Sequence, residues 1–424
     1  MSSSATPASL FRYSRDNTIY EKGATVNRDV TAISGATALI ERRWVPDAVI
    51  LVRDGRITAV GLAKEIRIPR GAHRIEARER FVAPGFIDIH IHGSGGFRAE
   101  DGALGMARHV IRSGTTWFLP TFISNDFDKM LAAIDHVAGC VGPVEGGATI
   151  GGIHLEGPFL NPKYGAQRPE TNIEPEPKFV RQLIKRCGKN LRLVTIAPER
   201  RGAIEAIQAF RAAGATVAIG HSDAAEAEYR AGRAAGITHA THLFNAMPPR
   251  LWPTRATYGG TKVVGVEELI LADDGVSADI LCDATAAHVH PSLLKVALKC
   301  KGIEKLSLIT DAMMAAGLPD GEFKMVDGQS VFKNPQEDVA RLANGALCGS
   351  VMSMCGALRN FIKHTGTSPE QALTMVSEAP ARVAGIFDHK GSIAAGKDAD
   401  LVLLDPNLDV QSVMIGGRVS YENA

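Results

Sequence analysis

The chain has 424 residues, of which 45% are hydrophobic and 22% are charged, and its formal net charge is +1. This composition is typical of a globular protein with one large domain and a smaller one. The small net charge gives no electrostatic reason to expect nucleic acid or an anionic membrane as a partner, and no apolar stretch approaches the ~18 residues of a membrane span.

The N-terminal segment is polar and aperiodic, and we expect its first ~25 residues to form an extension. It has no basic region followed by an apolar one, so no signal peptide is predicted. The six cysteines form no CxxC pair. This favours buried, reduced thiols and a cytoplasmic location.

Both ends of the chain have the pattern of β structure. Short strands with turns are predicted from about Ala36 to Phe81, and Ala48–Val60 resembles a hairpin with Asp54-Gly55 at its turn. Near the other end, Gly391–Asp405 and Val413–Val419 show the same pattern. We therefore expect a small β domain assembled from both termini.

The middle of the chain alternates short apolar strands with Ala-rich amphipathic helices, which is typical of βα units and a parallel sheet. The strand candidates end near His92, Thr121, Glu156, Ala197, His221, His242, Asp283 and Asp311. Eight such units suit a closed barrel. A doubly wound open sheet would need a Gly-rich phosphate turn after an early strand, and Gly93-Ser-Gly-Gly96 is only superficially similar.

The predicted fold is therefore α/β, a TIM-like (β/α)8 barrel with a small β-sandwich domain built from both termini. We place the N-terminal extension and the first part of the small domain in residues 1–82, the barrel in 83–384, and the second part of the small domain in 385–424.

Side chains that bind metals recur at the predicted strand ends. His90 and His92 are two residues apart on one strand, so they point to the same side. Imidazoles or carboxylates follow at later strand ends, in Glu156, His221, His242 and Asp311. Because barrel enzymes place their chemistry at the carboxyl ends of the strands, the sequence predicts a divalent-metal site there.

Each residue also has an ordinary explanation when it is taken alone. His221 could be a hydrogen-bonded polar residue, and Glu156 or Asp311 could cap the next element. These explanations would have to hold independently at five strand ends, which favours the metal site. His154 shares a strand face with Glu156 and is expected behind the ligands, while His288 is expected to contact substrate.

Seven motifs occur in a fixed order, and they span most of the chain from about Ala48 onward: APGFIDIHIHG, GGIHLEGPFLNP, TIAPE, AIGHSDA, THLFNAMPP, LITDAM and GSIAAGKDADLVLLD. This ordered set resembles the N-acetylglucosamine-6-phosphate deacetylase family of the amidohydrolase superfamily. Strand 4, Arg192–Ala197, offers no lysine. That argues against the dihydroorotase, hydantoinase and urease branches, in which a carbamylated lysine bridges two metals.

The resemblance implies roles for the strand-end residues. The implied metal ligands are His90, His92, Glu156, His221, His242 and Asp311. The first two histidines match a second metal site that only some members keep, so one or two ions per subunit are implied, with Glu156 as their bridge. Zinc is expected, with Fe, Co or Mn as alternatives. Asp311 also matches the catalytic acid/base of the family.

The resemblance also implies contacts to substrate. These are Gln167, Asn245, Ala246, Arg255, His288, Leu347 and Gly349. Three segments depart from the family pattern. Arg250–Gly260 replaces an Arg-Glu-Pro-Gly motif, and Arg255 is the best match to its phosphate-binding arginine, with Arg250 second. The segment Asp283–His290 is longer than usual, and Gln167 stands where many members carry histidine.

The implied reaction is metal-dependent hydrolysis of N-acetylglucosamine 6-phosphate to glucosamine 6-phosphate and acetate, with Asp311 as general acid/base. The alternatives are an amidohydrolase for another N-acetylated amino sugar, unphosphorylated or differently substituted, or for an N-acyl amino acid. A non-catalytic scaffold is disfavoured because all the ligand positions are retained. A homodimer is expected.

Overall fold

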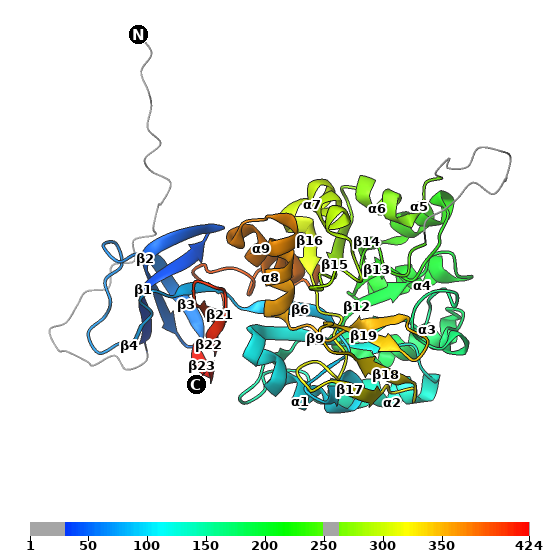
Figure 1. The fold of residues 1–424 in the computed structure, drawn as a ribbon, viewed down its shortest axis with the longest axis horizontal. Coiled ribbons are helices and arrows are strands. Elements are labelled where there is room, and N and C mark those ends of the chain that lie inside the picture. Colours follow the sequence, from blue (N-terminus) through cyan, green and yellow to red (C-terminus); the bar gives the residue numbers. More distant parts are fainter. Residues whose placement is uncertain (1–29, 249–262, 424) are drawn as a thin grey trace, which may run out of the picture.

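The computed structural model describes residues 30–248 and 263–423. The expected N-terminal extension lies outside the described residues, and so do Arg250 and Arg255. A barrel and a smaller β domain lie beside each other, and strands from both ends of the chain, blue and red in Figure 1, make up the smaller one. This arrangement confirms the predicted α/β fold.

The barrel is built from eight parallel strands in chain order. They are β6 (Phe86–Ile91), β9 (Thr115–Ile123), β11 (Ile153–Glu156), β12 (Leu191–Ile196), β13 (Thr216–Ile219), β14 (Ile237–Ala240), β15 (Ser277–Ile280) and β16 (Leu306–Leu308). Between the last and the first strand, the Asp311 amide donates to the His90 carbonyl at 2.9 Å. The Thr310 hydroxyl donates to Asp88 at 2.6 Å, so side chains also join this seam.

Helices cover the outside of the barrel (Figure 1). They are α1 (Ala99–Val110), α2 (Phe127–Ala138), α3 (Pro177–Cys187), α4 (Ala203–Ala212), α5 (Glu226–Ala235), α6 (Val266–Ala272), α7 (Pro291–Lys305), α8 (Met354–Thr365), α9 (Pro369–Val376) and α10 (Glu378–Val383). In α1 the buried residues recur every three or four positions, which is the spacing of one helix face. All of β6 is buried, as a parallel strand covered on both sides should be.

The small domain joins the two ends of the chain in one hydrogen-bonded sheet. Its strands are β1 (Val30–Ile40), β2 (Arg43–Arg53), β3 (Arg56–Leu62), β4 (His73–Glu76), β5 (Phe81–Pro84), β21 (Leu401–Leu404), β22 (Val410–Ile415) and β23 (Arg418–Glu422). The predicted hairpin is present as β2 and β3, with Asp54-Gly55 between them. The link between the termini is the antiparallel pair β5 and β21. The exact domain limits stay a prediction.

A four-stranded antiparallel sheet follows the last barrel strand, and the sequence did not predict it. Its strands are β17 (Gly321–Lys324), β18 (Ser330–Lys333), β19 (Val339–Leu342) and β20 (Leu347–Ser350). The family resemblance implies a substrate-lining turn at Leu347–Ser350, and the turn is wrong because these residues form β20 and pair with β19. The short ribbons β7 (Gly93–Ser94) and β8 (Phe97–Arg98), the strand β10 (Thr149–Ile150) and the 3₁₀ helices Ile111–Ser113, Pro169–Thr171 and Gly188–Asn190 complete the fold.

All six cysteines are free, but they are not all buried. Cys300 is exposed on α7 and Cys140 is partly exposed, so the expectation of six buried thiols is wrong for these two. Cys300 lies on the outer side of a helix whose buried residues include Leu294 and Ala297. In the described part of the chain, no helix has the length and apolar character needed to span a membrane.

Candidate metal centre and substrate cavity

Six buried side chains converge at the carboxyl ends of the barrel strands. We call them the donor cluster: His90, His92, Glu156, His221, His242 and Asp311. Three of them have a left-handed backbone, with φ of 47° at His221, 32° at His242 and 47° at Asp311. Such values are uncommon outside glycine and concentrate at functional sites. The strained backbone therefore supports a functional role for this end of the barrel.

Glu156 stands between two pairs of imidazoles. Its Oε1 lies 2.9 Å from Nε2 of both His221 and His242. Its Oε2 lies 3.2 Å from Nε2 of His92 and 3.4 Å from Nε2 of His90. Each carboxylate oxygen thus faces one histidine pair, which is the arrangement expected of a bridging ligand.

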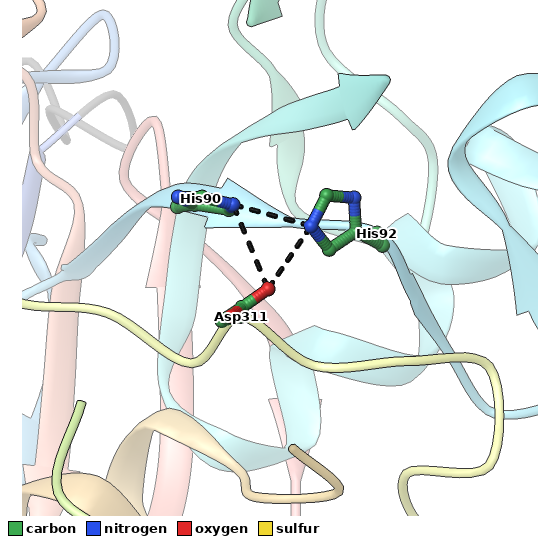
Figure 2. A group of neighbouring side chains, drawn as sticks. All are labelled: His90, His92 and Asp311. Atoms are coloured by element: carbon green, nitrogen blue, oxygen red, sulfur yellow. Dashed lines mark hydrogen bonds and ion pairs between the residues drawn. The ribbon is translucent and has the colours of Figure 1, made fainter. Parts of the chain in front are cut away.

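Asp311 completes the second group of donors. Figure 2 shows its carboxylate pointing at both His90 and His92. The Asp311 Oδ1 atom lies 3.0 Å from His92 Nε2 and 3.6 Å from His90 Nε2, and the two Nε2 atoms are 3.2 Å apart. His90 lies in β6, His92 follows the end of β6, and Asp311 lies in the segment after β16, so the barrel seam brings the three residues together.

The spacing of these atoms fits a metal ion. Ligands at ~2.1 Å from a tetrahedral zinc ion are about 3.4 Å from one another. The donor atoms of His90, His92 and Asp311 are 3.0 to 3.6 Å apart, and those of Glu156, His221 and His242 are 2.9 Å apart. Imidazole nitrogen and carboxylate oxygen are the donors that Zn, Fe, Co and Mn accept. The residues present therefore fit one or two divalent ions.

Backbone carbonyls orient two of the imidazoles. His92 donates from Nδ1 to the Thr121 carbonyl at 3.0 Å, and His221 donates from Nδ1 to the Tyr164 carbonyl at 3.1 Å. These bonds leave the Nε2 lone pairs free to face the cluster, as in metal sites. For the Nδ1 atoms of His90 and His242, residues 30–248 and 263–423 supply no partner.

The cluster is electrostatically polarised. Burial raises the pKa of Glu156, but the surrounding imidazoles outweigh burial and hold its pKa well below the usual range. Burial likewise raises the pKa of Asp311, but the nearby His90 and His92 outweigh burial and lower the pKa below its usual value. Burial lowers the pKa of His242, yet the Glu156 carboxylate reverses this and raises the pKa to about 9. The carboxylates therefore stay ionised, which is the form that binds a cation.

Two glycines allow the chain to pass close to the cluster. Gly349 of β20 has φ of +64°, and a Cβ atom there would lie 2.5 Å from the Asp311 carbonyl oxygen. Gly165 has φ of +107°, and its Cβ would lie 2.5 Å from His221 Nδ1. Larger residues at either position would displace a donor. The four-stranded sheet and the segment around residue 165 therefore support the cluster directly.

A cavity of about 360 Å³ opens above the donor cluster. The residues expected to contact substrate that line it are Gln167, Asn245, Ala246, His288, Leu347 and Gly349. Arg255 lies outside the described residues. All the predicted substrate-contact residues within the described part of the chain therefore lie around one cavity. Their contacts with substrate stay predictions.

Several lining residues were missed by the sequence analysis. They are Ile123, Gly165, Ala166, Met313, Met325 and Ala346. None of them carries a strong chemical signal, because an apolar wall residue looks like any core residue in the sequence. Met313 was nonetheless within reach of prediction, since it follows Asp311 by two residues.

The other histidines near the strand ends take supporting positions. His154 lies behind the cluster, where its ring meets the His90 ring edge-on at 4.8 Å and its Nε2 pairs with the Thr195 hydroxyl at 2.9 Å. Burial lowers the pKa of His154 well below its usual value, so the ring is neutral. This agrees with the expectation that His154 lies behind the ligands.

The fold and the site together define the class: a (β/α)8-barrel protein with a metal-type donor cluster at the carboxyl ends of its strands. The amidohydrolase family model matches residues 81–420. The N-acetylglucosamine-6-phosphate deacetylase of Bacillus subtilis is 32% identical over 92% of this chain and 96% of its own length. The N-acetylgalactosamine-6-phosphate deacetylase of Escherichia coli O157:H7 is 33% identical over 90% of this chain and 97% of its own length.

A solved structure agrees with these relatives. The N-acetyl-D-glucosamine-6-phosphate deacetylase of Mycobacterium smegmatis, a variant in complex with N-acetyl-D-glucosamine 6-phosphate, is 30% identical with a TM-score of 0.80. The match covers 92% of this chain and 99% of that chain. The chain therefore belongs to the amidohydrolase superfamily and, within it, to the N-acetylglucosamine-6-phosphate deacetylase family.

Proposed function

We propose that this protein hydrolyses the N-acetyl group of N-acetylglucosamine 6-phosphate, giving glucosamine 6-phosphate and acetate. The observation that carries this proposal is the donor cluster with its central Glu156, which faces one histidine pair with each oxygen. The deacetylases of Bacillus subtilis and Mycobacterium smegmatis support the substrate, since both match almost the whole chain.

The donor cluster would hold the metal. Glu156, His221 and His242 would form one ligand group, and His90, His92 and Asp311 the other. A divalent ion in such a site lowers the pKa of water and polarises a carbonyl oxygen. Zinc fits the nitrogen-rich donor set best, and Fe, Co or Mn fit the same donors. Metal content of the purified protein, measured by mass spectrometry, tests this assignment.

Asp311 is the proposed general acid/base. Its carboxylate lines the cavity, is almost buried and remains ionised, so it can accept a proton. In the proposed reaction Asp311 takes a proton from the water that attacks the acetamide carbonyl. It then returns that proton to the amine nitrogen as the C–N bond breaks, which makes the amine a better leaving group.

Gln167 is the proposed donor to the acetamide oxygen. Its side chain lies in the cavity wall, and its Nε2 already donates to the Tyr164 carbonyl at 3.2 Å. An amide nitrogen has two hydrogens, so the second can serve the oxygen on which negative charge develops. Asn245, Ala246, Leu347 and Gly349 would line the sugar.

A related substrate is the main alternative. The relative from Escherichia coli O157:H7 is an N-acetylgalactosamine-6-phosphate deacetylase, and it is 33% identical to this chain, against 32% for the N-acetylglucosamine-6-phosphate deacetylase of Bacillus subtilis. The two sugars differ in the orientation of one hydroxyl group. The same donor cluster and the same reaction would serve either sugar, so the cavity wall decides between them.

Acetate release with four sugars tests the proposal. We would assay zinc-loaded protein with N-acetylglucosamine 6-phosphate, N-acetylgalactosamine 6-phosphate and the two unphosphorylated sugars. The highest kcat/KM is expected for N-acetylglucosamine 6-phosphate. A higher value for the galactosamine compound would favour the alternative, and turnover of unphosphorylated sugars alone would contradict both.

The phosphate contact has a test of its own. The family resemblance implies Arg255, with Arg250 second, for this contact, and both lie outside the described residues. If Arg255 binds the phosphate, Arg255→Ala should raise KM sharply for phosphorylated sugars and not for unphosphorylated ones. A kinetically silent variant would remove this assignment. The expected homodimer and cytoplasmic location stay predictions, which sedimentation and cell fractionation can test.

A further inference from the structure

The segment between β15 and α7 carries two histidines, one exposed and one in the cavity wall. His290 is exposed and caps α7, where its Nδ1 accepts a hydrogen bond from the Ser292 amide at 3.2 Å. His288 instead lines the cavity, with only 4% of its side chain exposed. The structure thus places His288 in the cavity wall, whereas His290 has a structural role as the N-cap of α7.

Asp283 organises this segment through its carboxylate. Oδ2 accepts hydrogen bonds from the His288 amide at 2.9 Å and from His288 Nδ1 at 3.1 Å. Oδ1 accepts from the Ala287 amide at 2.7 Å and from the Thr285 hydroxyl at 2.8 Å. Burial raises the pKa of Asp283, but these donors outweigh it and hold the pKa far below its usual value. The carboxylate is therefore charged, and each of its oxygens accepts two hydrogen bonds from within the segment.

The segment is also anchored independently of this carboxylate. The Ala284 amide donates to Asp338 at 2.7 Å, and His364 Nε2 of α8 donates to the Asp283 backbone carbonyl at 3.1 Å. Asn360 of α8 donates to the Cys282 carbonyl at 3.0 Å. These bonds do not involve the Asp283 side chain, so they still hold the backbone of the segment when that side chain is changed.

One ring nitrogen of the cavity-lining His288 is not used by the described part of the fold. Its Nδ1 donates to Asp283, and within the described ranges no residue forms a hydrogen bond with its Nε2. Outside the donor cluster, Gln167, Asn245 and His288 are the polar side chains that line the cavity in the described part of the chain. Of these, His288 alone can carry positive charge.

We propose that Asp283 is a positioning residue that aims His288 Nε2 at a phosphate oxygen of the substrate. This inference rests on the proposed function, because it takes the substrate to be a sugar phosphate. It also accounts for the longer segment between Asp283 and His288. The additional residues fold into a turn capped by the Asp283 carboxylate, with Ala286 at φ of 56°, and His288 still reaches the cavity.

The first test is Asp283→Asn, compared with wild type in acetate release. The variant keeps the shape of the side chain but loses its charge and part of its accepting capacity. We expect KM for N-acetylglucosamine 6-phosphate to rise about tenfold while kcat changes less than about twofold, because the contact is one of binding. For unphosphorylated N-acetylglucosamine we expect kcat/KM to stay unchanged.

Two further variants separate positioning from loss of structure. Thr285→Val removes a different bond to the same carboxylate, from an exposed residue, and should leave KM within about twofold of wild type. Asp283→Asn added to His288→Asn should raise KM no further than His288→Asn alone, since Asp283 acts through that ring. Additive effects in the double variant, or an unchanged KM in Asp283→Asn, would overturn the proposal.

A binding measurement makes the test independent of turnover. Glucose 6-phosphate carries the phosphate but no amide to cleave, and calorimetry gives its Kd for each zinc-loaded protein. We expect about tenfold weaker binding by both Asp283→Asn and His288→Asn. Equal binding by all variants would overturn the role of Asp283. If wild type binds glucose 6-phosphate in this pattern yet releases no acetate from any sugar, the proposed function fails and the positioning role stands.

Discussion

The floor and the wall of the cavity differ in how they are built. The floor is the donor cluster, whose six side chains come from strand ends and are held by a rigid barrel. The wall, formed by residues 165–167, 245–246, 288, 313, 325 and 346–349, comes from connecting segments and from the antiparallel sheet. The floor would determine the reaction, and the wall would determine the substrate. Mutations in the two regions should therefore change different kinetic constants.

The largest effect is expected at Glu156, because it serves both groups of ligands. Glu156→Gln removes the charge that faces four imidazoles, and kcat/KM should fall on the order of 10⁴-fold together with the metal content. Acetate release and mass spectrometry of the same sample measure both. Glu170→Gln, a change of an exposed carboxylate in a nearby 3₁₀ helix, is the matched control and should be silent. Full metal content in Glu156→Gln would contradict a bridging role.

Asp311 belongs to the floor but should act mainly on the chemical step. Asp311→Asn removes the proposed proton acceptor while Glu156, His221 and His242 remain, so at least one metal ion should stay bound. We expect kcat to fall on the order of 10³-fold with little change in KM. Asp320→Asn, a change of an exposed carboxylate, serves as the control. Substantial kcat in Asp311→Asn would assign the proton transfer to another group.

Gly349 lies where the wall meets the floor, so it tests whether the two are coupled. Gly349→Ala would place a Cβ atom 2.5 Å from the Asp311 carbonyl oxygen, and kcat/KM should fall about 100-fold through displacement of Asp311. Gly146→Ala is a matched control, because Gly146 has φ of +65° but no atom within 4 Å of the added Cβ.

Both glycine variants should lose about 1–3 kcal/mol of stability from backbone strain, measured by denaturant unfolding. Only Gly349→Ala should lose activity as well. Equal loss of activity in the two variants would show that strain alone, rather than contact with Asp311, determines the effect.

The smallest effect is expected at Tyr164, whose carbonyl accepts the hydrogen bond from His221 Nδ1. The Tyr164 hydroxyl donates to Asp223 at 2.8 Å, and this bond helps to hold that carbonyl in place. Tyr164→Phe should weaken zinc binding about tenfold, measured by competition with a chelator. Unchanged zinc affinity would show that other contacts suffice to hold the segment.

The contrast between floor and wall also explains what the sequence could predict. The six donors were predictable because imidazoles and carboxylates are unusual at the ends of buried apolar strands. The eight barrel strands were predictable because their short apolar runs alternate with amphipathic helices. Each strand ends within three residues of the position expected from the sequence.

The wall was harder to predict for physical reasons. The strands β17 to β20 are short and partly exposed, so they lack a continuous apolar pattern. The carbonyl of Tyr164 orients a ligand, but every residue has a carbonyl and the sequence gives no sign of this one. His288 binds Asp283 and lines the cavity, whereas His290 binds the Ser292 amide and caps α7. Which histidine takes which position depends on how the segment folds, so the sequence alone does not indicate it.

One zinc titration tests the central claim most directly. Metal-free protein is titrated with zinc, and bound zinc and acetate release from N-acetylglucosamine 6-phosphate are measured in the same samples. Our account predicts that acetate release is absent without metal and rises with bound zinc to a plateau at one or two ions per chain. Acetate release that persists in metal-free protein, or zinc that binds without restoring release, would contradict the account.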